Sequence, residues 1–161
     1  MKKIVAVILT LTCVMAMSLS AFAEAPKEKA NKVDSQLREE IQVLKTKLEG
    51  LRAQAQGLHD QAAAKRDTIK DLIKTNKEAE ATEKLEAAKT LRDTLKAINA
   101  EIKNLRDVKK ALWEEVKNAR TNKDFETVKA KLAQIIQQKS AIIGKINVKL
   151  GILDQIIAAL R

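Results

Sequence analysis

Few side chains in this chain could carry out catalysis. His59 is the only histidine and Cys13 is the only cysteine. A nucleophilic serine or cysteine needs a histidine base that is held by a third group, and a zinc site needs several nitrogen, sulfur or carboxylate ligands. A single histidine on a helix provides neither arrangement. We therefore predict no catalytic residue, no metal site and no cofactor.

The other groups with catalytic potential are two pairs of adjacent acids, Glu39-Glu40 and Glu114-Glu115. Neighbouring residues on a helix point to different sides, so neither pair can act on one bond. The glycines lie inside segments of helical periodicity and form no loop that could hold phosphate. Trp113 is expected at the edge of a core. We therefore predict that the protein is not an enzyme.

The first 23 residues have the pattern of a bacterial export signal. Two lysines follow Met1, an apolar run covers 4–19, and Ala21 and Ala23 are the small residues that a signal peptidase requires. This pattern predicts a signal peptide over 1–23 and a single helical domain over 24–161, located in the periplasm or outside the cell. An uncleaved membrane anchor is the alternative, but the run is short for a bilayer span.

The mature chain has no cysteine, so a core must stabilise it without disulfides. Aromatic residues make up 2% of the sequence, and the core is therefore expected to consist of Leu, Ile, Val and Ala. The abundance of Ala, Glu, Lys, Leu and Arg is typical of long helices or coiled coils. Pro26 is the only proline, so no later position would break a helix by ring clash.

Apolar residues recur in steps of four and three along three segments, 37–72, 88–119 and 125–160. These steps place the apolar residues on one face of a helix, as in a coiled coil, whereas a strand would need alternation by two. We call the three sets the apolar stripes. Four lysines interrupt them: Lys65, Lys109, Lys139 and Lys149.

Short polar breaks around 74–78 and 120–124 separate the stripes. We expect a threonine or asparagine to cap each following helix, Thr75 or Asn76 at the first break and Thr121 or Asn122 at the second, with Glu78 and Asp124 in the new first turns. The helices would then cover about 29–74, 77–119 and 123–160. Because short connections make neighbouring helices antiparallel, we predict an all-α fold: an elongated antiparallel bundle, or hairpins, of about three long helices with coiled-coil-like heptad packing.

The third segment carries a second apolar column beside its stripe. This arc is wider than a simple seam needs, and it has two interpretations. In the first, the third helix is central and is covered on two sides by the others. In the second, the arc is a surface for clients, for a second copy or for an anionic surface. The residues predicted to form a client-binding or dimer surface are Ile136, Ile143, Leu150, Ile157, Lys139 and Lys149.

The chain is basic, with a net charge of +10 that falls to +8 when Lys2 and Lys3 leave with the signal peptide. Most charged residues are expected on a solvated face, where acids three residues before a base form weak pairs. The surplus favours attraction to acidic proteins, an anionic membrane or a cell-wall polymer. Nucleic acid is not expected as a partner, because export argues against it and too few aromatic side chains exist for base stacking.

Two segments resemble the Spy and CpxP group of periplasmic chaperones and stress regulators. The segment 122–130, Asn-Lys-Asp-Phe-Glu-Thr-Val-Lys-Ala, is similar to the place where that family puts an Asp and an aromatic residue after the turn into a long helix. The segment 32–38 is similar to the family's Leu-Thr-x-x-Gln motif and keeps its glutamine as Gln36. The resemblance implies a homodimeric helical cradle that binds partly unfolded proteins without ATP.

We therefore expect an exported, ATP-independent, chaperone-like protein that holds partly unfolded or acidic envelope clients on an amphipathic helical surface. Its expected partners are proteins, either unfolded clients or a second copy in a homodimer. The alternative is a structural coiled-coil protein or scaffold of the cell envelope, associated with anionic membrane or wall polymer.

Overall fold

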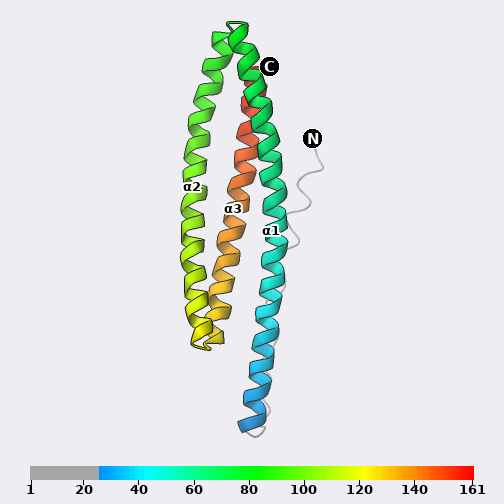
Figure 1. Cartoon of the computed structure of the whole chain (residues 1–161), viewed down its shortest axis with the longest axis vertical. Coiled ribbons are helices and arrows are strands. Elements are labelled where there is room, and N and C mark those ends of the chain that lie inside the picture. Colours follow the sequence, from blue (N-terminus) through cyan, green and yellow to red (C-terminus); the bar gives the residue numbers. More distant parts are fainter. Residues whose placement is uncertain (1–25) are drawn as a thin grey trace.

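The computed structural model describes the backbone of residues 26–161 and the side chains of 35–161. The described residues form three α-helices, which are α1 (Pro26–Glu78), α2 (Thr82–Thr121) and α3 (Phe125–Leu160) (Figure 1). They contain no strand, and the predicted all-α bundle of long helices is confirmed. The predicted signal peptide lies outside the described residues.

The apolar stripes explain why these segments are helices and why the helices pack. Every stripe residue, from Leu37 in α1 to Leu160 in α3, is buried or half-buried. The interrupting lysines are half-buried at the same positions. At a rise of 1.5 Å per residue, the 53 residues of α1 span about 80 Å, and the molecule is a long rod (Figure 1).

The two connections are tight turns of the same type. Glu80 (φ 54°) and Lys123 (φ 58°) adopt the left-handed conformation just after α1 and α2. In each turn, the next N–H donates to a carbonyl five residues earlier, from Ala81 to Asn76 and from Asp124 to Ala119. This is the Schellman arrangement, which satisfies carbonyl groups at a helix end and reverses the chain.

The predicted helix boundaries and caps were partly wrong. α1 continues to Glu78, about one turn beyond its expected end. Thr75 and Thr121 remain inside helices, where their hydroxyls donate to carbonyls four residues earlier. The cap of α3 is instead Asp124, whose carboxylate accepts from the backbone N–H and the hydroxyl of Thr127. A threonine hydroxyl can donate to a carbonyl within its own helix as well as cap the start of a helix. Sequence spacing alone therefore did not locate the ends of α1 and α2.

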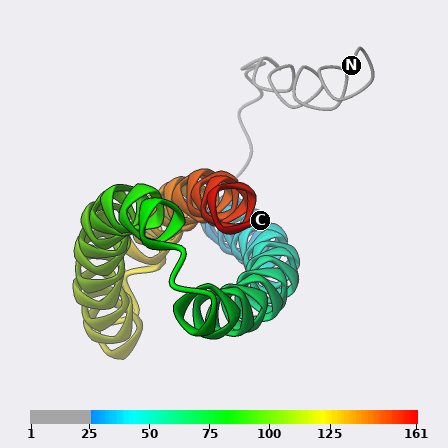
Figure 2. The same ribbon diagram turned by 90° about the horizontal axis from the view of Figure 1, so that it is seen from above.

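α3 lies between the other two helices and packs along both of them, whereas α1 and α2 make few contacts with each other. In Figure 1, α1 and α2 converge at the end where 79–81 joins them, and the view along the axis in Figure 2 shows α3 beside both. α1 and α3 are parallel, and α2 is antiparallel to both (Figure 1). Of the two interpretations of the wide apolar arc, the central third helix is therefore confirmed.

The core follows α3 from end to end. Near the α2–α3 turn, Leu132 and Ile135 of α3 pack with Leu48 of α1 and Val116 of α2. In the middle, Ile146 of α3 packs with residues of both neighbours. Near the C-terminus, α3 packs against α1 and α2 close to their connection. Removing α3 would thus expose the stripes of both other helices.

Candidate functional site

A groove runs between α1 and α2, with α3 as its floor. It exists because α1 and α2 each pack on α3 and leave space between themselves over most of their length. Two cavities in this groove are lined by side chains from all three helices. They share Lys45 and Trp113, so they adjoin, and together they form the main candidate binding surface of the described residues.

The cavity nearer the α2–α3 turn has a volume of about 480 Å³ and is largely apolar. We call it the apolar section. Trp113, 37% exposed, is its most accessible large apolar side chain. Arg38 lies over the ring of Phe125, 5.8 Å from its centroid, as a cation–π pair. The lining residues are Arg38, Ile41, Gln42, Lys45, Trp113, Val116, Arg120, Phe125, Val128 and Leu132.

The adjoining cavity, about 300 Å³, carries positive charge from each helix. Arg52 comes from α1, Lys109 from α2 and Lys139 from α3. Burial, and then the neighbouring Arg106 and Arg52, lowers the pKa of Lys109. Burial, and then Lys109 and Arg52, also lowers the pKa of Lys139. These cations are therefore close enough to repel one another.

A second group of cations lies beyond this cavity, toward the α1–α2 connection. Arg106 of α2 donates from Nη2 to Nε2 of His59 in α1 over 3.0 Å. Because arginine only donates, this bond requires a neutral His59 with its proton on Nδ1. Burial, and then Arg66 and Arg106, lowers the pKa of Lys149 of α3, whose ammonium donates to Asn99 Oδ1 over 2.8 Å.

We call the cavity around Lys109 and Lys139, together with the second cation group beside it, the cationic section. Glu49 lines the cavity, and the charge of Asp60 acts on His59. Its positively charged or basic members are Arg52, His59, Arg66, Arg106, Lys109, Lys139 and Lys149.

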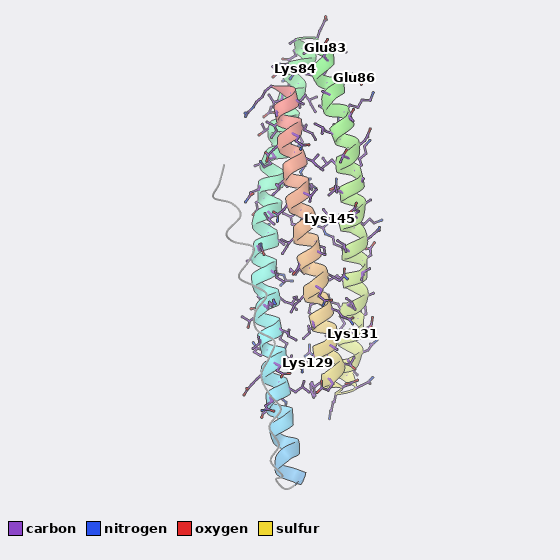
Figure 3. All side chains as sticks on the ribbon, turned by 180° about the vertical axis from the view of Figure 1, so that it is seen from behind. Glu83, Lys84, Glu86, Lys129, Lys131 and Lys145 are labelled. Atoms are coloured by element: carbon purple, nitrogen blue, oxygen red, sulfur yellow. The ribbon has the colours of Figure 1, made fainter. Side chains whose placement is uncertain are left out.

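Three lysines of α3 outside the groove are paired with acids. Lys129 forms an ion pair with Glu40 of α1, and Lys131 forms one with Glu115 of α2, at 2.5 Å each. Lys145 pairs with a glutamate of α2 as well. Figure 3 shows Lys129 on the side of α3 that faces α1, with Lys131 and Lys145 on the side that faces α2. The charges of these three lysines, on the sides of α3 that face α1 and α2, are thus neutralised. Lys139 in the groove forms no ion pair with an acid of the described residues.

The structure separates the six residues that were predicted to form one surface. Ile136, Ile143 and Leu150 are buried within the monomer, at 6–8% exposure. Ile157 is half-buried and packs on the core near the C-terminus. Only the lysines of the set lie in the groove. The assignment of the four apolar residues to a client or dimer surface stays a prediction, and contact with them would require α1 or α2 to move away from α3.

Sequence reasoning identified Lys109, Lys139 and Lys149 as interruptions of the stripes, but it did not bring them together. It missed Arg52 and Arg106, which flank the stripes. The sequence did contain a signal for this cation group, because arginines lie at helical spacing beside the lysines of the stripes. Their grouping also depends on the vertical register of α1, α2 and α3, which the sequence pattern does not specify.

Among the side chains of 35–161, no group of three or more His, Cys, Asp or Glu residues could hold a metal ion. No helix in the described part of the chain is long and apolar enough to cross a membrane. Comparison with protein-family models, curated protein sequences and solved structures finds no match to this chain. The resemblance to the Spy and CpxP group stays a prediction.

Proposed function

We propose that this chain is an exported, ATP-independent binding protein that holds partly unfolded or acidic envelope proteins by surface contact. The observation that carries the proposal is the open groove, in which apolar side chains remain reachable between α1 and α2. A closed three-helix bundle would bury them. An unfolded protein segment could bury its own apolar residues against Trp113 and Phe125 there.

The charges around the apolar section suit this function. Arg38, Lys45 and Arg120 line the cavity beside the apolar side chains. Positive charges at the rim of a binding surface speed encounter with acidic partners and contribute less to the final affinity. A patch of limited size also restrains self-association of the protein. Together these features support moderate, reversible holding of varied clients.

The test measures whether the mature protein, without ATP, suppresses light scattering from an unfolding, acidic client protein. We compare it with Trp113→Ser, which removes the exposed aromatic group of the groove. The matched control is Val108→Ser, since Val108 is also an exposed apolar residue of α2 (48%) but lines neither groove cavity. We expect suppression by the parent and by Val108→Ser, and a loss of at least fivefold for Trp113→Ser.

A circular dichroism melt of each variant controls for folding. No suppression by the parent protein, or equal loss in both variants, contradicts the proposal. In that case the alternative of an envelope scaffold without clients becomes the better explanation, and the rod shape of the molecule is its main support (Figure 1).

A further inference from the structure

The distribution of lysines on α3 has two distinct patterns. On its outer seams, Lys129, Lys131 and Lys145 each have an acidic partner on a neighbouring helix. In the groove, Lys139 has no ion pair with an acid of the described residues, and Lys149 donates only to the neutral Asn99. On α3, the lysines of the outer seams are therefore neutralised by acids, whereas Lys139 and Lys149 lie near other cations.

This clustering is costly for the folded protein unless an anion binds. Partly buried like charges repel more strongly than exposed ones, because less water screens them. The lowered pKa values of Lys109, Lys139 and Lys149 have burial as their first cause and neighbouring cations as their next. Stripe positions are normally apolar. Lys109 and Lys139 occupy such positions and line one cavity together with Arg52, which points to a ligand of high negative charge.

The arrangement of the cations restricts the ligand. Arg52, Lys109 and Lys139 come from three helices and line one cavity of about 300 Å³, so the ligand must present several negative charges within a small space. Carboxylates on a helix face are about 5–6 Å apart. Linked phosphate groups are narrower and carry more closely spaced charge, and both lysine and arginine bind phosphate well.

We propose that the cationic section is a binding site for a linear oligophosphate, which lies along the groove between α1 and α2. Arg52, Lys109 and Lys139 hold one part of the chain of phosphates. Arg106, Lys149 and Arg66 hold the next part toward the α1–α2 connection. The site adjoins the apolar section and shares Lys45 and Trp113 with it, but Arg52, Lys109 and Lys139 line only the cationic section. The proposal therefore goes beyond the holding function proposed above and does not depend on it.

The experiment measures binding of inorganic tripolyphosphate to the mature protein by isothermal calorimetry, with the fluorescence of Trp113 as a second signal. Trp113 is the only tryptophan and lines the same cavity. Orthophosphate and an oligoglutamate peptide are the comparison ligands. We expect tripolyphosphate to bind at least tenfold more tightly than either, with an affinity that falls as salt screens the charges.

The test variant is Lys109→Gln/Lys139→Gln. The control is Lys103→Gln/Lys110→Gln, which removes the same charge from exposed positions of α2 that line neither groove cavity. We expect the test variant to lose at least tenfold in affinity and the control to lose less than threefold. The melting temperature of the unliganded test variant should equal or exceed that of the parent, because a repulsion has been removed.

Three results would overturn the proposal. The first is no binding of tripolyphosphate to the parent protein. The second is equal loss in both double variants, which would indicate attraction to net charge alone. The third is oligoglutamate binding as tightly as tripolyphosphate, which would assign the groove to acidic protein segments. Client holding by the Lys109→Gln/Lys139→Gln variant, measured in parallel, separates failure of this site from failure of the holding function.

Discussion

Asn76 is the buried polar residue of the described chain, at 6% exposure. Its side-chain amide donates to the carbonyl of Leu72 in its own helix over 2.8 Å and to that of Leu160 over 2.7 Å. Leu160 ends α3, where the last carbonyls lack a helical partner. Asn76 therefore attaches the end of α3 to α1, beside the contact of Lys84 with the carbonyl of Arg161.

We expect Asn76→Ala to destabilise the protein by about 1–3 kcal/mol, because it leaves the buried carbonyl of Leu160 without this donor. Urea unfolding followed by circular dichroism measures the change. Thr75→Ala is the control, since its hydroxyl donates to a carbonyl at an exposed position, and it should change stability by less than about 0.5 kcal/mol. Equal effects of the two substitutions would contradict a special role for Asn76.

His59 makes the stability of the fold depend on pH. Burial lowers its pKa first, followed by Arg106, Lys149 and Arg66, and only Asp60 acts in the opposite direction. The folded state therefore takes up a proton at lower pH than the unfolded state, whose histidine has a pKa of about 6.5. Stability is complete above that value, and it falls as the pH decreases through the folded-state pKa.

We expect the melting temperature of the parent to fall between pH 7.5 and pH 5.5, and we expect His59→Gln to remove most of that fall. Glutamine can still accept a hydrogen bond from Arg106 without gaining a charge. Thermal melts at several pH values in this range measure the effect. A parent and variant with the same pH dependence would show that His59 does not titrate against these cations.

At the scale of elements, α3 has two distinct faces. One is buried along its whole length, and the other contains Gly144 and Gly151, where an added Cβ would meet nothing within 4 Å. Glycines on one face of a helix can allow another backbone to approach closely. In the monomer Gly144 and Gly151 face open space, and a glycine inside a helix only lowers its stability.

Gly144→Ala/Gly151→Ala should stabilise the protein by about 1 kcal/mol for each site, because alanine has the higher helix propensity. Gly50→Ala/Gly57→Ala in α1 is the matched control and should give a similar gain, since its glycines also have free space. Urea midpoints at several protein concentrations measure both. A loss of stability for the α3 pair alone would reveal a second chain packed against this face.

At the scale of the whole molecule, α3 is the shared core of the bundle. Ile146, fully buried at its middle, belongs to a cluster with Ile102 of α2, and Leu58 of α1 packs against that cluster. Because α1 and α2 make few contacts with each other, each depends on α3 for its packing. We therefore expect the helices to unfold together.

Ile146→Ala should destabilise the protein by about 2–5 kcal/mol through lost burial and a central cavity. Val148→Ala is the control on the same helix, because Val148 is 50% exposed, and it should have little effect. Trp113 fluorescence and helical circular dichroism should give one coincident urea transition. Separate transitions for the two signals would indicate that α2 and α1 keep independent cores.

The spacing of apolar residues was enough to predict three long helices and the buried face of each. The reason is local: apolar residues at steps of four and three allow few other solutions, and stripe members from Leu37 to Leu160 behaved as predicted. Helix ends were less certain, as Thr75 and Thr121 show, because several polar residues could serve as caps.

The wider apolar arc of the third segment was compatible with a central helix and with a binding surface, and the tertiary structure was needed to choose between them. The structure also showed that α1 and α2 leave a groove, because an apolar arc does not specify which neighbours cover it. The same choice placed Ile136, Ile143 and Leu150 inside the monomer. It also brought Arg52, Lys109 and Lys139 together from three helices. Their proximity depends on the axial positions of α1, α2 and α3 relative to one another, which the packing of the whole bundle sets.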